Sequence, residues 1–130
     1  MTTSSTLYVC VTCRSSGEAS TGESRAGARL LAAAERGLAE AATNLSVVGV
    51  ECLSNCSRSC SAAVAAPGKW TYVIGNLDPE QHASDILAFA RQHSIHELGL
   101  PVWRERPEHI RKNTIARVPP MPTVTVKEPS

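Results

Sequence analysis

Five cysteines are the residues of this 130-residue chain whose type and spacing suit metal or thiol chemistry. Cys10 and Cys13 form a C-x2-C pair, and Cys52, Cys56 and Cys60 form a later C-x3-C-x3-C group. Thiolates bind zinc in tetrahedral sites and also hold iron–sulfur clusters. No secretory signal precedes the first cysteine, so we expect a reducing, cytoplasmic location, where an odd number of cysteines is poorly explained by disulfides.

Two short strands are expected directly before the two cysteine groups. Residues 7–12 and 45–50 are rich in β-branched and aromatic side chains, which is typical of buried strands. Between them, residues 20–23 have capping-box spacing, and apolar residues then recur every three or four positions to about residue 43, which predicts a helix. Neighbouring parallel strands of a β-α-β unit end at the same edge of the sheet. Both cysteine groups are therefore expected to converge on one metal centre.

The next part of the chain predicts a hairpin and a second helix. Residues 62–66 and 70–74 are predicted strands joined by a Pro-Gly turn at 67–68. Asp78 is placed to cap a helix that has Pro79 at its first position. The order β-α-β-β-β-α indicates an α/β (α+β) fold of thioredoxin-like arrangement, with a mixed sheet and flanking helices.

Charge and proline content divide the chain unevenly. Residues 1–99 carry 7 Lys and Arg against 9 Asp and Glu, whereas residues 100–130 carry 6 against 3. We expect a thioredoxin-like domain over 1–99, an irregular extension packed on it over 100–117, and a flexible Pro-rich tail over 118–130. A net charge of +1 argues against nucleic-acid binding, and no apolar run approaches the roughly 20 residues of a membrane helix.

Cysteine spacing favours an iron–sulfur site over zinc. Zinc ribbons usually present two C-x2-C knuckles, whereas the second group here is C-x3-C and the first lies partly within a predicted strand. A zinc- or cobalt-binding metal-handling protein remains an alternative. A thiol–disulfide oxidoreductase using Cys10 and Cys13 is a third, but a redox C-x-x-C normally begins a helix, and here the helix begins near residue 21.

A family resemblance adds to these observations. Residues 50–56, Val-Glu-Cys-Leu-Ser-Asn-Cys, followed by Pro-Gly-Lys-Trp-Thr-Tyr at 67–72, resemble the thioredoxin-like [2Fe–2S] ferredoxins and the matching small subunit of respiratory complex I. Further short motifs lie along the whole chain: Cys-Val-Thr-Cys-Arg at 10–14, Trp-Thr-Tyr at 70–72, Pro-Val-Trp at 101–103, Arg-Pro at 106–107 and Ala-Arg-Val-Pro at 116–119. With these, the whole chain looks more like a bacterial family described only as predicted metal-binding and associated with cobalamin biosynthesis genes.

The resemblance implies an electron carrier, not an enzyme, that works with redox partner proteins and forms a homodimer. Through the second family, it also implies a reductive step linked to cobalamin or cobalt metabolism. It assigns a [2Fe–2S] cluster to Cys10, Cys13, Cys52 and Cys56. The ferredoxins have no cysteine where Cys60 stands, so that residue is open to three roles: an alternate ligand, a reactive thiol or a small buried side chain.

Further residues have open roles. Arg14 and Arg58 adjoin cysteines of the assigned set, and Lys69 lies on the adjoining hairpin. Cations near a cluster whose formal charge goes from about −2 to about −3 on reduction raise its reduction potential, although the arginines are equally compatible with solvated loop positions. His93 fits either the inner face of its helix or a solvated helix end, and Trp103 is expected to anchor the extension.

Overall fold

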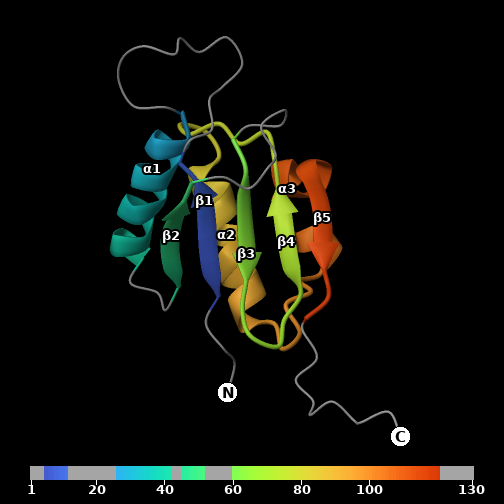
Figure 1. The fold of residues 1–130 in the computed structure, drawn as a ribbon. Coiled ribbons are helices and arrows are strands. Elements are labelled where there is room, and N and C mark those ends of the chain that lie inside the picture. The colour runs from blue at the N-terminus through green and yellow to red at the C-terminus, as the bar shows by residue number, and fades with distance from the viewer. Residues whose placement is uncertain (1–4, 12–25, 42–44, 52–59, 121–130) are drawn as a thin grey trace, which may run out of the picture.

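The computed structural model describes residues 5–11, 26–41, 45–51 and 60–120, apart from the side chains of residues 40 and 41. Within them lies a five-stranded mixed sheet of strand order β2-β1-β3-β4-β5, together with helices α1, α2 and α3 (Figure 1). The elements are β1 (Thr6–Cys10), α1 (Ala26–Ala41), β2 (Ser46–Val50), β3 (Ala62–Ala65), β4 (Thr71–Ile74), α2 (Ala83–Ile95), a short 3-10 turn (Trp103–Glu105), α3 (Glu108–Asn113) and β5 (Thr114–Val118).

The predicted β-α-β unit is confirmed. Strands β1 and β2 pair in parallel, in a register that runs from Thr6 opposite Ser46 to Cys10 opposite Val50. Helix α1 returns the chain between them and buries Leu30 and Ala34 completely, as the apolar periodicity of this segment requires. The predicted capping box at residues 20–23 lies outside the described residues.

The predicted hairpin is also confirmed, with its turn at Pro-Gly. The backbone N–H of Lys69 donates to the carbonyl oxygen of Ala66 at 3.1 Å, and Gly68 adopts a φ of +76°. Such a turn needs a positive φ at its third residue, which glycine adopts without strain. Beyond the strands, Cys60 and Leu77 exchange two backbone hydrogen bonds of 2.9 and 3.3 Å, so the pairing extends to the cysteine.

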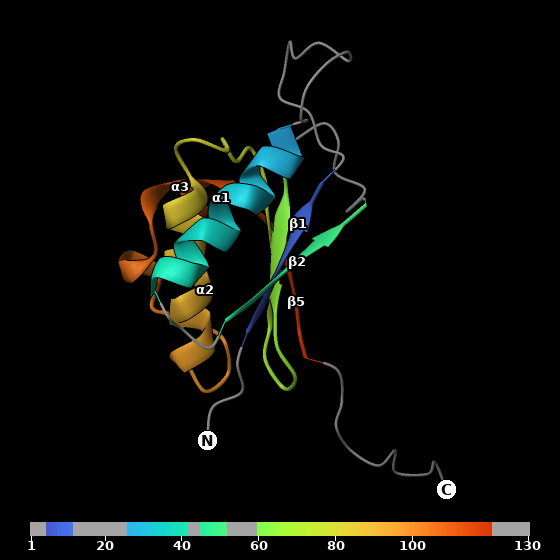
Figure 2. The ribbon, with the colours of Figure 1, turned by 90° about the vertical axis from the view of Figure 1, so that its left-hand side faces the viewer.

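The helices cover one face of the sheet only. Figure 2 shows α1, α2 and α3 on the same side of the strands, with no described helix on the other side. Leu7, Val9, Val64 and Tyr72 are fully buried, and the Tyr72 ring meets the Phe89 ring of α2 edge-on at 5.1 Å between centroids. The main core therefore lies between the sheet and this helical layer.

The start of α2 differs in part from the sequence prediction. The Asp78 carboxylate accepts hydrogen bonds from the backbone N–H groups of Glu80 and Gln81 at 2.8 and 3.0 Å, as a capping residue does. The regular helix nevertheless begins later, at Ala83. The helix begins later because residues 78–82 form a separate turn, in which the backbone N–H of Asp78 donates a hydrogen bond to Nδ1 of His82 at 2.8 Å.

The segment expected to be an irregular extension instead contains α3 and β5. Strand β5 pairs antiparallel with β4 from Thr71 opposite Val118 to Ile74 opposite Thr114, and so forms one edge of the sheet. Three of its five residues are exposed, because β5 lies at the edge of the sheet. Its sequence therefore lacks the alternation of apolar and polar residues by which a half-buried strand is recognised.

Arg106, and not Trp103, fastens this segment to the core. The Trp103 side chain is 60% exposed. The Arg106 guanidinium lies over the Tyr72 ring, 5.2 Å from its centroid, and donates twice to the Pro101 carbonyl oxygen, at 2.7 and 3.0 Å. A stacked guanidinium with two directed hydrogen bonds gives a more specific attachment than a partly solvated indole.

Candidate metal centre

Three chain segments that lead to or carry cysteines meet at one edge of the sheet. The N–H of Val11, just after β1, donates to the carbonyl oxygen of Val50 at the end of β2, at 2.8 Å. The N–H of Cys10 donates to the carbonyl oxygen of Ser61, just before β3, at 3.1 Å. The structure therefore brings the positions before Cys13 and Cys52 beside Cys10 and next to the segment that holds Cys60.

Cys10 is the one member of the predicted ligand set that the described ranges include. It ends β1, is 1% exposed, and its thiol donates to the Glu51 carbonyl oxygen across a distance of 3.7 Å. Cys13, Cys52 and Cys56 lie outside the described residues, as do Arg14 and Arg58. In the parts of the chain that are described, no group of three His, Cys, Asp or Glu side chains is arranged to hold a metal ion.

The donor chemistry at this edge fits a thiolate-bound metal centre. A soft sulfur donor at the end of a buried strand suits zinc or an iron–sulfur cluster, and neither needs carboxylate ligands. Cys13 is three positions beyond Cys10, and Cys52 directly follows Glu51, whose carbonyl oxygen lies within hydrogen-bonding distance of the Cys10 thiol. Both chain segments thus leave the sheet beside the same sulfur atom.

Cys60 occupies a different environment from Cys10. Both cysteines are buried members of the core cluster, but Cys60 stands two positions before Ala62, in the alternation of β3 that faces the helices. Cys10 follows Val9, which faces the helices opposite Ala62, so the alternation of β1 directs Cys10 to the other side. This difference favours the buried-side-chain role for Cys60.

Lys69 does not lie near this edge. Its ammonium group donates to the carbonyl oxygens of His93 and Ser94 at the end of α2, at 3.2 and 2.6 Å, and the residue is 3% exposed. The six residue-to-residue steps from Cys60 to Ala66, at about 3.3 Å each, separate the cysteine end of this segment from the hairpin turn by roughly 20 Å. Burial lowers the pKa of Lys69, and the lysine completes the carboxyl end of a helix.

His93 lies on the inner face of α2, so the solvated interpretation is wrong. The residue is fully buried, with Nδ1 at 2.6 Å from the Ser5 hydroxyl and Nε2 at 2.6 Å from the Trp70 carbonyl oxygen. Because a carbonyl oxygen only accepts, Nε2 carries the proton and Nδ1 accepts from Ser5. Burial is the main cause of a lowered pKa for His93, and the nearby Lys69 lowers it further.

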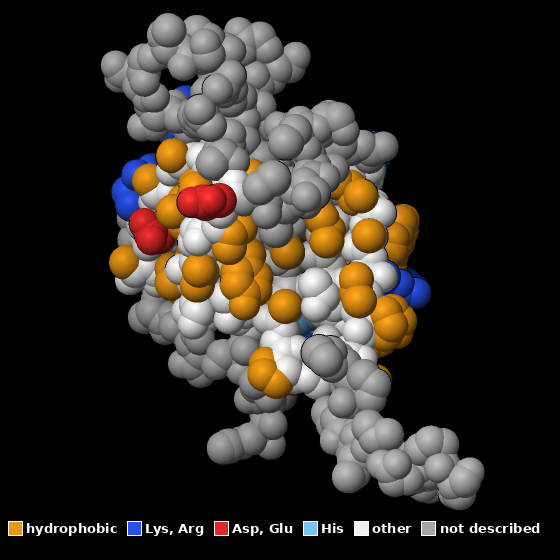
Figure 3. Space-filling model, viewed as in Figure 1, with side chains coloured by type: hydrophobic (Ala, Val, Ile, Leu, Met, Phe, Trp, Pro, Cys, Tyr) orange, Lys and Arg blue, Asp and Glu red, His pale blue; other side chains and the backbone are white. Residues whose placement is uncertain are grey.

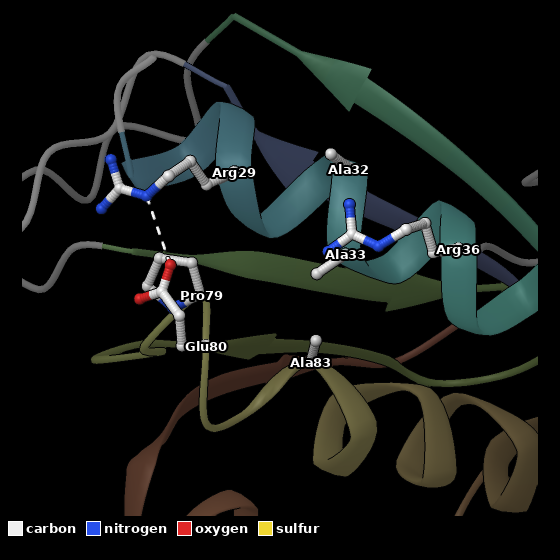
Figure 4. A pocket seen from close by; sticks show the side chains of 7 residues that line it. All are labelled: Arg29, Ala32, Ala33, Arg36, Pro79, Glu80 and Ala83. Atoms are coloured by element: carbon white, nitrogen blue, oxygen red, sulfur yellow. Dashed lines mark hydrogen bonds and ion pairs between the residues drawn. The ribbon is translucent and has the colours of Figure 1, made fainter. Parts of the chain in front are cut away.

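Sequence reasoning missed a surface groove between α1 and the chain that enters α2. Arg29, Ala32, Ala33 and Arg36 of α1 line one side, and Pro79, Glu80 and Ala83 line the other, around about 340 Å³ (Figure 4). Arg29 and Glu80 form an ion pair at 3.4 Å. The seven-residue spacing of the two arginines places them on one helix face and is the signal that could have revealed this groove.

These features define a thioredoxin-like α+β protein with a cysteine-bearing edge at the ends of its parallel strands. Residues 7–120 match the model of the family described as "Protein of unknown function (DUF1636)", and the chain belongs to this family. No curated protein matches the chain. None of the described helices is long and apolar enough to span a bilayer.

Solved structures with this fold include thioredoxin-like [2Fe–2S] ferredoxins from Aquifex aeolicus. One shares 16% identity at a TM-score of 0.55, covering 88% of this chain and 92% of that chain. The wild-type ferredoxin at 1.5 Å resolution also shares 16% identity, at a TM-score of 0.50, covering 87% of this chain and 97% of that one. At this level of identity, the similarity establishes the fold.

Proposed function

We propose that this protein is a [2Fe–2S] ferredoxin-like electron carrier and not an enzyme. The observation that carries the proposal is the parallel pairing of β1 with β2, which places Cys10 beside Val50 and the chain leading to Cys52. The fold shared with thioredoxin-like [2Fe–2S] ferredoxins over almost the whole chain supports it. We place this activity in the cytoplasm, where thiols stay reduced.

Four cysteines would hold the cluster, namely Cys10, Cys13, Cys52 and Cys56. When bound, the cluster supplies one-electron transfer. The protein positions the first thiol on a strand paired on both sides and buries that residue, Cys10, which is 1% exposed. Arg14 and Arg58 would add positive charge next to the cysteines and so favour the reduced state.

Metal analysis of the anaerobically purified protein tests this proposal. We expect about two iron and two acid-labile sulfide per chain, a visible absorption spectrum, and an electron paramagnetic resonance signal on one-electron reduction. A colourless protein with one zinc per chain would establish the metal-handling alternative. A metal-free protein that reduces disulfides would establish the oxidoreductase.

Voltammetry tests the role of the arginines. We expect Arg14→Gln and Arg58→Gln each to lower the reduction potential, whereas the matched change Arg104→Gln, on the exposed 3-10 turn, leaves it unmoved. An unchanged potential in both cysteine-adjacent variants contradicts the proposed role.

The proposed clients are redox partner proteins, including one for a reductive step in cobalamin or cobalt metabolism. In stopped-flow mixing, reoxidation of the reduced protein by a cob(II)alamin-loaded reductive partner should be faster than by the same partner without cob(II)alamin. Equal or slower transfer removes the cobalamin client and leaves the cluster assignment intact.

A further inference from the structure

The groove between α1 and the turn that leads into α2 carries more positive than negative charge. Three of the residues that line it are charged, namely Arg29, Arg36 and Glu80. The guanidinium of Arg36 makes no hydrogen bond or ion pair with any residue that the structure describes. Its side chain is exposed and runs back along α1 toward Ala33, over the groove (Figure 4). A planar guanidinium in this position can bind a carboxylate through two parallel hydrogen bonds.

Glu80 stands where a second anion would bind. Its carboxylate oxygen is 3.4 Å from Nε of Arg29, and the two side chains are 67% and 41% exposed. An ion pair this open to water contributes little to stability, because solvent screens it. A carboxylate from outside that contacts Arg29 through both oxygens can therefore replace Glu80 at small cost.

Small side chains form the floor of the groove. Ala32, Ala33 and Ala83 end at Cβ, and Pro79 beside them is buried. The backbone of an extended segment can therefore lie close to α1. The volume of about 340 Å³ is at the lower end of the range for ligand sites, about 300–1,000 Å³, so the groove fits a short segment better than a large cofactor.

The spacing of the two arginines favours an occupant with two separate acidic groups. Arg29 and Arg36 are seven positions apart on α1, which is about 10.5 Å along the helix axis. Two acidic residues three positions apart in an extended segment are separated by about 10 Å, which matches this spacing. A single small anion does not span it, and a nucleic acid would need a broader basic surface than two arginines beside a glutamate.

The groove lies beside the cysteine-bearing edge of the sheet. Leu77 exchanges two backbone hydrogen bonds with Cys60, and Pro79, two positions later, lines the groove. Figure 3 looks onto the opposite face of the sheet, where apolar side chains cover the strands and charged side chains lie toward the margins. An acidic segment at this end of the molecule therefore meets the two arginines on the helical side.

We propose that this groove binds an extended acidic segment of a partner protein. One carboxylate of the segment pairs with Arg36, and a second displaces Glu80 from Arg29. A segment bound here brings its protein to the cysteine-bearing edge. That this protein exchanges electrons with the chain rests on the proposed function, whereas the binding itself requires no cluster.

Fluorescence anisotropy of a labelled peptide, titrated with the full-length protein purified anaerobically, tests the proposal. The peptide has ten residues of alanine and glycine except for two glutamates three positions apart. We expect saturable binding with a dissociation constant below about 1 mM at low ionic strength, weakened by added salt. A peptide with glutamines in place of the glutamates should bind at least about tenfold more weakly, and one with adjacent glutamates at least about threefold more weakly.

Variants locate the peptide on the protein. Arg36→Gln should weaken binding at least about fivefold, whereas Arg91→Gln, the same charge change at an exposed position of α2, should leave it unchanged. Glu80→Gln should strengthen binding at least about threefold, because it removes the competing carboxylate. Ala32→Tyr fills the floor at an exposed position without a change of charge and should abolish binding.

Several results would overturn the proposal. These are no binding at 1 mM protein, equal effects of Arg36→Gln and Arg91→Gln, or unchanged affinity in either Glu80→Gln or Ala32→Tyr. Full displacement of the peptide by an equal concentration of inorganic phosphate would also overturn it, because the groove would then be a small-anion site. Iron and sulfide are measured on the same sample. Cluster-loaded protein that does not bind the peptide contradicts this proposal alone, and colourless protein that binds it contradicts the proposed function alone.

Discussion

Replacing Cys60 by alanine is expected to leave the metal centre intact and to lower stability. The side chain is fully buried in the core cluster, on the helix side of the sheet. Removing one buried sulfur is comparable to deleting slightly more than a methylene group and leaving a small cavity, which costs about 1–2 kcal/mol. For a domain of this size, roughly 4 °C per kcal/mol gives a fall in apparent Tm of about 4–8 °C.

The assay combines iron and sulfide per chain with thermal unfolding followed by circular dichroism. Cys60→Ser adds a second measurement. Its buried hydroxyl should lower the free energy of unfolding by about 1–3 kcal/mol more than Cys60→Ala does, although both variants lack the same thiol. The matched control is Cys10→Ser, which we expect to lose the cluster. Loss of iron in Cys60→Ala, or full iron in Cys10→Ser, would refute the reasoning about the two sides of the sheet.

The remaining predictions concern stability. The pKa of His93 is lowered in the folded protein, so just below pH 6.5 this histidine binds a proton in the unfolded chain but not in the folded one. The free energy of unfolding should therefore fall as the pH drops below 6.5, by at most about 1.4 kcal/mol per pH unit. Urea titrations at several pH values should show a shallower fall in His93→Gln, and an identical slope contradicts this. Arg106→Ala should cost about 1–2 kcal/mol by removing the stack on Tyr72, whereas exposed Arg104→Ala should cost almost nothing; equal effects would exclude the stack. Gly99→Ala should cost more than about 2 kcal/mol, because its φ is +69° and a Cβ would lie 2.7 Å from Nε2 of His93. An unchanged unfolding midpoint would show that this loop can move.

Local signals account for the parts of the fold that the sequence predicted correctly. The Pro-Gly turn depends on glycine at a positive φ, and α1 depends on apolar residues such as Leu30 and Ala34 that recur at helical spacing. Both are properties of adjacent residues. The convergence of the cysteine segments followed from them, because a parallel β-α-β unit has one arrangement of strand ends.

Contacts between distant residues account for the parts that were missed. His93 is fixed by Ser5, 88 positions away, and a helix-end histidine carries no sign of such a partner. Strand β5 exists because β4 offers an unpaired edge, which its own residues do not reveal. The large Trp103 side chain was expected to attach the C-terminal segment to the domain, but it is exposed. The buried aromatic ring at this contact is that of Tyr72, and the segment attaches to it through the guanidinium of Arg106.

The position of β1 between β2 and β3 also sets an order of events during synthesis. Cys10 leaves the ribosome 42 positions ahead of Cys52 (52 minus 10), and its partner strand β2 is made in the same interval. At about 5–20 residues per second, the first two thiols wait roughly 2–8 s before the strand that positions the others exists. Oxygen or a stray metal ion has its best access to Cys10 until β3 has also been made and pairing on both sides closes the strand end.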